Sequence, residues 1–156
     1  MASQTGTLII VPCGRAKIWD KSPQAGPVPA RLAYTGAPFK VNREYAEHFG
    51  DRWVILSAKY GFLNPEDTVE GTYNVTFKRR APAPIRPAVL REQIRDKGLE
   101  RFDQVVGLGG RDYRAVIEQA FAASPVTLHF PFSGLPLGQS LQAAKRAIAC
   151  NQPFPI

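Results

Sequence analysis

The chain has 156 residues, of which 44% are hydrophobic, and its 20 Lys and Arg against 13 Asp and Glu give a formal net charge of +7. This length suits one domain over residues 1–156 with a substantial core, and no apolar run approaches the ~20 residues that a membrane-spanning helix needs. The beginning of the sequence lacks the basic and apolar regions of a secretion signal. We therefore expect a cytoplasmic protein with reduced cysteines and no membrane partner.

Strand and helix patterns alternate along the chain. In chain order, they predict a strand over 7–12, a helix over 38–49, a strand over 53–57, a helix over 85–97, a strand over 104–108, a helix that opens at 109–112, a strand over 126–130 and a helix over 140–150. Ser140 is expected to cap the last helix. Two long loops, over residues 14–37 and 61–84, contain many Gly and Pro residues.

This order predicts an α/β fold, with a mostly parallel four-stranded sheet flanked by helices and two long loops at its rim. The strand over 53–57 has an apolar run at residues 54–56 that ends at Ser57, which is typical of a strand buried on both faces. In such folds ligands bind beyond the carboxyl ends of the strands. The site is therefore expected where the chain leaves each strand.

Two lysines follow the first two strands in this way. Lys59 comes directly after an apolar strand, where desolvation would lower its pKa and make it a nucleophile or a base. Alternatively, it points into water or pairs with a nearby acid, for which the candidates are Glu66, Asp67 and Glu70. Lys17 follows the first strand less tightly. If the sheet is parallel, both amines reach the same edge.

Cys13 and Arg15 also follow the first strand. Arg15 and Lys17 are cations that would lower the pKa of the Cys13 thiol, which gives it nucleophilic character. A small buried thiol is the alternative. Arg15 can also hold a phosphate group.

Aromatic and glycine-rich segments supply further candidates for substrate binding. Tyrosine rings near the rim can stack on a base, although packing in the core is the alternative for each. These tyrosines are Tyr34, Tyr60, Tyr73 and Tyr113. Gly109, Gly110 and Arg111 open a helix and can present N–H groups and a charge to an anion, although a tight strand-to-helix turn needs glycine in any case.

The positive charge is concentrated in one part of the chain, although a uniformly basic protein is the alternative interpretation of the pI of 9.7. Eight basic residues lie between Lys78 and Arg101 against three acids. Six of them are the expected contacts to nucleic acid: Lys78, Arg79, Arg80, Arg86, Arg91 and Arg95. Such a patch favours a polyanionic partner, for which we expect DNA rather than RNA.

Several short motifs together resemble a bacterial and phage family that shares Cys-x-x-x-Lys, Tyr-Thr-Gly and Leu-Ser-Ala-Lys-Tyr-Gly sequences. In this chain they are Cys13 to Lys17, Tyr34 to Gly36 and Leu56 to Gly61, together with Tyr73 and a Gly-Gly-x-x-Tyr turn at Gly109 to Tyr113. The family is distantly similar to the YaaA peroxide-stress proteins and to the core domain of archaeosine synthase. Pro12-Cys13-Gly14 has glycine where the synthase motif has serine.

This resemblance implies a Rossmann-like three-layer core, a site around Lys17, Ser57 and Lys59, and a nucleic-acid context. The first hypothesis is an enzyme that cleaves a glycosidic bond or modifies a base in DNA or RNA. The second is a DNA-binding protein of stress or phage defence without catalysis. With no Cys-x-x-Cys pair or His/Cys cluster in the sequence, we predict neither a metal site nor a cofactor.

Overall fold

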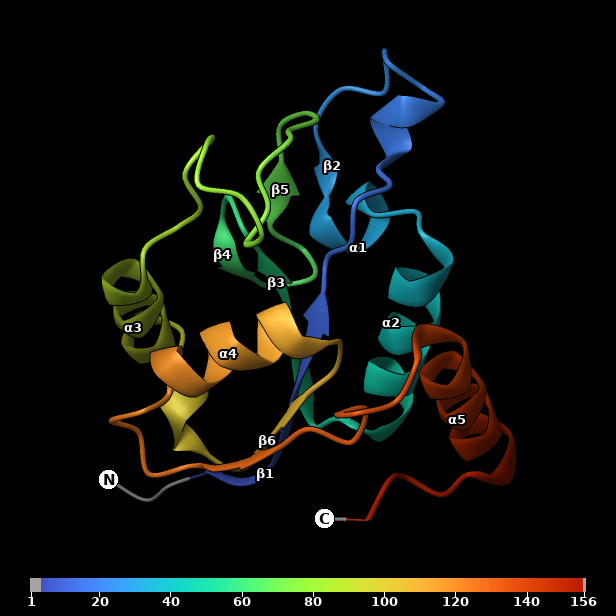
Figure 1. Cartoon of the computed structure of the whole chain (residues 1–156), viewed down its shortest axis with the longest axis vertical. Coiled ribbons are helices and arrows are strands. Elements are labelled where there is room, and N and C mark those ends of the chain that lie inside the picture. The colour runs from blue at the N-terminus through green and yellow to red at the C-terminus, as the bar shows by residue number, and fades with distance from the viewer. Residues whose placement is uncertain (1–3, 156) are drawn as a thin grey trace.

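The computed structural model describes residues 4–155, and a five-stranded sheet in the order β4-β3-β1-β6-β7 forms its centre (Figure 1). The strands are β1 (Gln4–Pro12), β3 (Arg52–Ser57), β4 (Gly61–Leu63), β6 (Phe102–Gly107) and β7 (Thr127–His129). Strand β1 pairs in parallel with β3 and β6, and β6 pairs in parallel with β7. The predicted mostly parallel sheet is therefore confirmed. The prediction missed β4, which pairs antiparallel to β3.

Helices cover both faces of this sheet and complete three layers (Figure 1). They are α2 (Ala37–Phe49), α3 (Pro87–Asp96), α4 (Arg111–Ala120) and α5 (Leu137–Cys150). The core has two clusters of buried residues, with α2 and α5 in one and α3 and α4 in the other. The fold is Rossmann-like, as predicted.

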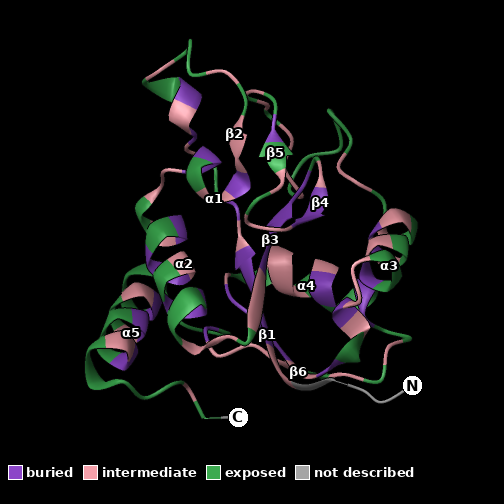
Figure 2. Cartoon of the chain, turned by 180° about the vertical axis from the view of Figure 1, so that it is seen from behind, coloured by how far each residue is buried: buried purple, intermediate pink, exposed green. Residues whose placement is uncertain are grey.

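Alternate side chains of the central strands enter opposite clusters. Ile9, Val11 and Ile55 pack on the side of α2 and α5. Their sequence neighbours Ile10 and Leu56 pack on the side of α3 and α4. All of these side chains are at most 1% exposed, and Figure 2 colours most of β3 as buried. Burial on both faces explains why these strands are continuous apolar runs.

The two long rim loops contain short elements that pair with each other. The first includes a 3-10 turn, η1 (Ile18–Asp20), strand β2 (Val28–Pro29) and a single helical turn, α1 (Ala30–Ala33). The second includes β5 (Thr68–Val69), which pairs antiparallel with β2. Their pairing joins the rim loops, which the sequence predicted to be irregular.

Two helix starts differ from the prediction. Helix α3 begins at Pro87, because a residue that precedes proline is disfavoured in the helical conformation and Arg86 is accordingly extended. The backbone N–H of Ile85 donates to the carbonyl oxygen of Ala58 at 2.7 Å. Helix α5 begins at Leu137, and Ser140 is inside it rather than at its cap. The hydroxyl of Ser140 donates to the Leu137 carbonyl at 2.8 Å and is buried. A further 3-10 turn, η2 (Leu99–Arg101), leads into β6.

Within residues 4–155, none of the helices combines the length and the hydrophobicity that crossing a lipid bilayer requires.

Candidate functional site

Two lysine side chains meet at the aromatic ring of Tyr73. The ammonium nitrogen of Lys17, beyond the end of β1, is 4.4 Å from the ring centre, and that of Lys59, beyond the end of β3, is 5.5 Å away. Lys59 also lies 5.2 Å from the centre of the Tyr60 ring. The parallel pairing of β1 with β3 brings the two loops to one edge of the sheet. Tyr73 reaches this edge from the second rim loop.

The two lysines differ in their environment. Lys17 is only 6% exposed, whereas Lys59 is exposed to solvent. Burial is the main cause that lowers the pKa of Lys17, although the nearby Cys13 and Asp20 act in the opposite direction. The desolvation expected at Lys59 is thus wrong for that residue and occurs at Lys17 instead.

The surroundings explain why Lys17 is the enclosed amine. Its Nζ donates to the carbonyl oxygen of Arg15 at 3.0 Å, and its backbone forms a bridge with Tyr34. Two of the acids considered as partners for Lys59 pair elsewhere, because Glu66 contacts Arg31 at 2.7 Å and Asp67 contacts Lys97 at 3.2 Å.

A chain of hydroxyl groups lies beside the lysines. The hydroxyl of Tyr73 is 2.5 Å from that of Tyr34 and 2.6 Å from that of Ser57. Ser57 also accepts hydrogen bonds from the backbone N–H groups of Lys59 and Tyr60, both at 3.2 Å. Ser57 therefore ties the Lys59 loop to Tyr73.

The tyrosines of this chain have structural and surface roles that the sequence did not separate. Tyr34 is 2% exposed and packs in the core, so stacking of a ligand on its ring is wrong. Burial raises the pKa of Tyr34 and that of Tyr73 above the ordinary value of 10.0, so both remain protonated near neutral pH. Tyr60 is half-buried and packs edge-on against Tyr73.

Cys13 is buried next to the lysines. Its Sγ lies 3.7 Å from the hydroxyl of Tyr113, and the side chain is 4% exposed. Burial raises the pKa of the thiol above 9.0 and outweighs the opposing effects of Tyr113 and Lys17. The expectation that nearby cations activate this thiol is therefore wrong, and the alternative of a small buried thiol describes it. Both cysteines are free, and Cys150 is exposed.

A cavity of about 350 Å³ opens beside Lys17. Its lining contains four cationic side chains and one carboxylate, together with aromatic and small residues. They are Cys13, Gly14, Arg15, Lys17, Asn74, Val75, Thr76, Phe77, Lys78, Arg79, Asp112 and Tyr113. The ring of Phe77 packs edge-on against that of Tyr113 with 5.7 Å between centres. The cavity thus combines an enclosed amine, positive charge and aromatic walls.

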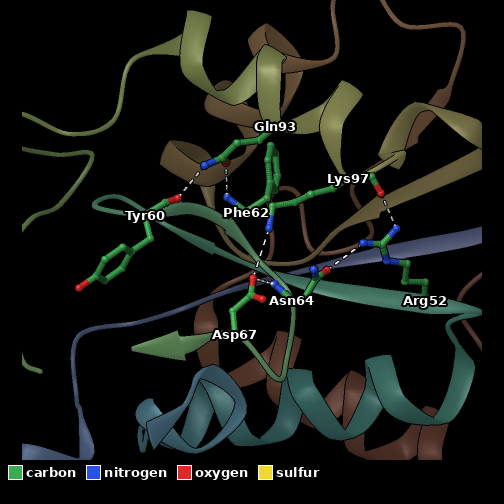
Figure 3. Close-up of polar contacts among 7 residues, drawn as sticks. All are labelled: Arg52, Tyr60, Phe62, Asn64, Asp67, Gln93 and Lys97. Atoms are coloured by element: carbon green, nitrogen blue, oxygen red, sulfur yellow. Dashed lines mark hydrogen bonds and ion pairs between the residues drawn. The ribbon is translucent and has the colours of Figure 1, made fainter. Parts of the chain in front are cut away.

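The turn that carries Lys59 and Tyr60 is held by a glutamine of helix α3 (Figure 3). The side-chain amide of Gln93 donates to the Tyr60 carbonyl at 2.9 Å, and its oxygen accepts from the Phe62 N–H at 2.8 Å. Gly61, between them, has a φ of +77°, and a Cβ there would collide with Gln93. This turn therefore requires glycine.

A second polar network anchors the segment after β4 (Figure 3). Arg52 donates to the Asn64 side chain at 2.8 Å and to the Lys97 carbonyl at 2.7 Å. Asp67 accepts from the Asn64 N–H at 2.8 Å and pairs with Lys97. Strand β4 and helix α3 are thereby fixed relative to the sheet.

The glycine-rich turn before α4 lies apart from the Lys17 cavity. Gly109, Gly110 and Arg111 line a different cavity of about 540 Å³, together with Arg114 and Ser133. Gly109 has a φ of +110°, and a Cβ there would lie 2.8 Å from Pro12 Cγ. Close packing against β1 therefore accounts for this glycine. Only the next part of α4, with Asp112 and Tyr113, reaches the lysine cavity.

The basic segment extends away from this cavity. Lys78 and Arg79 line the cavity, and Lys78 lies 3.8 Å from the carboxylate of Asp112. The others continue along the loop and helix α3: Arg80, Arg86 and Arg95 are exposed and Arg91 is half-buried.

Sequence reasoning missed several residues of the site. Asn74, Thr76 and Phe77 line the cavity, and Gln93 holds the turn. Nothing in their spacing relates them to Lys17, because they come from a loop and a helix far along the chain. In the part of the chain that the structure describes, His, Cys, Asp and Glu side chains do not gather in groups of three or more that could hold a metal ion.

Comparison with known proteins places the chain among relatives without an assigned activity. Residues 8–146 match the model of a family of unknown function, DUF6884. The uncharacterized protein YfjM of Bacillus subtilis is 43% identical over 142 residues, which cover 90% of this chain and 94% of YfjM. The crystal structure of AF0587, a protein of unknown function, aligns with a TM-score of 0.45 and 13% identity over 97% of this chain and 48% of AF0587.

Proposed function

Because the chain belongs to the DUF6884 family, whose function is unknown, we propose a function from the site itself. It is an enzyme that acts on a nucleobase or nucleoside in DNA or RNA, by glycosidic cleavage or base modification. The observation that carries the proposal is the enclosed amine of Lys17 beside a cationic cavity with aromatic walls. Nucleic acid, with DNA ahead of RNA, is the proposed partner, and the cytoplasm is the proposed location.

Lys17 is the reactive group in this proposal. A lysine with a lowered pKa is neutral in a larger fraction of molecules, and only the neutral amine is a nucleophile or a base. In glycosidic cleavage, Nζ bonds to C1′ of the sugar as the bond from C1′ to the base breaks. The bonding electron pair leaves with the base, and the proton lost by the new ammonium group goes to the base nitrogen.

The same amine can serve base modification by removing a proton from the ring or from an attacking group. Cys13 and Tyr113 stay protonated and lie beside this amine as hydrogen-bonding groups. Ser57 and Tyr73 position the Lys59 loop, and Lys59 is free to contact the strand outside the cavity.

The nucleic-acid context draws on two further observations. A base inside a duplex must leave the stack to enter a cavity of this kind, and Phe77 and Tyr113 offer aromatic surface for it. The motifs at Cys13–Lys17 and Leu56–Gly61 resemble those of proteins similar to the YaaA peroxide-stress proteins and the archaeosine synthase core, which supports a base within nucleic acid as the target.

The alternative is a DNA-binding protein of stress or phage defence without catalysis. The exposed basic residues from Lys78 to Arg95 favour it, since phosphate contacts need accessible cations and no reactive amine. In this alternative the Lys17 cavity is a structural feature.

Two variants separate the proposals. Single- and double-stranded DNA and RNA are incubated with Lys17→Met protein and with Arg91→Ala/Arg95→Ala protein, and released or altered bases are identified by mass spectrometry. Binding is measured in parallel by fluorescence anisotropy at several salt concentrations. The enzyme proposal expects Lys17→Met to lose turnover while it keeps most of its affinity for the strand.

The binding alternative expects loss only with the arginine changes, and a slope of log affinity against log salt that is shallower by about 0.7–0.9 for each lost phosphate contact. Lys59→Met serves as a matched lysine comparison, because its amine is exposed. If none of these variants alters any behaviour toward nucleic acid, both proposals fail and a small-molecule ligand becomes the better explanation.

A further inference from the structure

The charged groups of the Lys17 cavity are arranged by depth. Arg15, Lys78 and Arg79 are exposed at its mouth, whereas Lys17 and Cys13 are buried. Three exposed cations at the mouth form a place for an anion that remains in contact with water. In the buried part of the lining Lys17 supplies the one amine, and the half-buried Asp112 supplies the one carboxylate of the cavity.

The aromatic residues lie on one wall of the same cavity. Phe77 and Tyr113 pack edge-on at 5.7 Å, and the hydroxyl of Tyr113 is held by Cys13. Both residues are half-buried and line the cavity, so their rings can offer aromatic surface to a flat ring. A cavity of about 350 Å³ is near the lower end of the range of ~300–1,000 Å³ for small-ligand sites, so it has room for one ring and its sugar rather than for a stack of bases.

Lys78 is a cation of the mouth that lies near Asp112, the residue before Tyr113 of the aromatic wall. Its Nζ lies 3.8 Å from the carboxylate of Asp112, with the lysine side chain 77% exposed. Such a pair contributes little to stability, so an anion can take over the lysine at small cost. In the ion pairs of the described residues neither Arg15 nor Arg79 takes part, so both remain available at the mouth.

We propose that this cavity recognises a nucleoside monophosphate unit, with the phosphate held at the mouth by Arg15, Lys78 and Arg79 and the ring against Phe77 and Tyr113. This inference rests on the proposed function and narrows its substrate from a base or nucleoside to a nucleotide. The phosphate belongs either to a free mononucleotide or to one nucleotide of a strand, since the chemistry at the mouth is the same.

Calorimetric titration tests the inference. Wild-type protein is titrated with nucleosides, with their 5′-monophosphates and with inorganic phosphate, at low and at moderate salt. The monophosphates are expected to bind at least about tenfold more tightly than the nucleosides, because charge-assisted hydrogen bonds to phosphate are strong. The difference should shrink as salt increases, because the cations at the mouth are exposed.

Single substitutions at the mouth provide the decisive comparison. Arg15→Gln and Arg79→Gln are each expected to weaken monophosphate binding by about tenfold and to leave nucleoside binding unchanged, because they remove a phosphate partner only. Arg146→Gln, at an exposed position of helix α5, is the matched control and should change neither.

The outcomes separate this inference from the proposed function. Equal affinity for nucleosides and monophosphates would overturn the inference and leave the proposed function standing. Inorganic phosphate that binds as tightly as the monophosphates would overturn the role of the ring. A failure of nucleosides, monophosphates and oligonucleotides alike to bind would overturn both proposals.

The two sources of the phosphate are distinguished by a competition. An oligonucleotide that binds more tightly than the mononucleotide, and is displaced by it, identifies a strand as the source. A mononucleotide that binds while oligonucleotides do not identifies the free nucleotide. Both results support recognition of the monophosphate unit, whereas simultaneous binding of the two without competition would contradict it.

Discussion

The ammonium nitrogen of Lys17 lies 4.4 Å from the centre of the Tyr73 ring, while the hydroxyl of that same ring lies 2.6 Å from Ser57. One tyrosine therefore faces the enclosed amine with its ring and joins the loop after β3 with its hydroxyl. The two functions can be removed separately by substitution.

Tyr73→Phe keeps the ring and removes the hydroxyl. The hydroxyl of Tyr34 loses its partner, so we expect a loss of about 1–2 kcal/mol in the free energy of unfolding, measured by urea denaturation. Tyr73→Ala should cost more, because it also removes the ring contacts of Lys17 and Tyr60. Equal stability of the two variants would show that the ring contributes nothing.

Lys17→Met should abolish catalysis without destabilising the protein near neutral pH. The pKa of Lys17 is lowered from 10.5 by burial, so the unfolded chain binds its proton more tightly than the folded one. The free energy of unfolding of the wild type therefore rises with pH between the folded pKa and 10.5. Methionine avoids the burial of a charge. The free energy of unfolding of Lys17→Met should therefore exceed that of the wild type most near neutral pH, and the difference should shrink as the pH rises from the folded pKa to 10.5.

Urea denaturation at a series of pH values measures this difference. Lys59→Met is the matched lysine control, because the Lys59 side chain is exposed. A Lys17→Met protein that is less stable than the wild type at neutral pH by several kcal/mol would instead indicate that Lys17 is a structural ion.

Turnover should depend on pH through the same group. Because neutral Lys17 is the reactive form in our proposal, the rate should rise with pH and level off below the ordinary lysine pKa of 10.5. A pH–rate profile with the wild type measures it. A rate that falls as pH rises through this range would contradict the assignment of Lys17 as nucleophile or base.

The two thiols should differ in their rate of alkylation. Cys13 is buried with a raised pKa, whereas Cys150 is exposed, so iodoacetamide near pH 8 should label Cys150 first. Peptide mapping by mass spectrometry follows both sites. The Cys150→Ser variant should lose the fast phase, and a fast phase that persists would mean that Cys13 is accessible.

Gly61→Ala should destabilise the chain by about 2 kcal/mol or more, since its positive φ and the contact with Gln93 both oppose a side chain. Gly71→Ala is the matched control, because a Cβ there meets nothing within 4 Å. Thermal or urea unfolding of both variants measures the difference, and a similar loss for both would show that neither the positive φ of Gly61 nor its contact with Gln93 sets the cost.

The sequence allowed the sheet and the meeting of two lysines to be predicted, because both follow from apolar strands that are parallel and end in a lysine-bearing loop. The sequence could not show which of the two lysines is enclosed. The burial of Lys17 depends on Tyr34 and Tyr73, which come from later parts of the two rim loops and meet it only after those loops fold.

The remaining differences have the same origin. Strands β2 and β5 have two residues each, so neither shows a period, and they exist only as partners of one another. Strand β4 is three residues long and starts at Gly61, where the pattern favoured the beginning of a loop. Gln93 is one polar residue on an amphipathic helix, and its role depends on the turn that it touches.

Gln93 has a consequence for local opening of the molecule. By bonding on both sides of Gly61, it couples helix α3 to the turn after β3, so the two should open as one cooperative unit. In hydrogen–deuterium exchange, the amide of Phe62 should then be protected to the same degree as the interior of α3, and Gln93→Ala should release the turn first. In the wild-type protein, helix α3 and the turn that carries Lys59 should therefore lose their protection from exchange together.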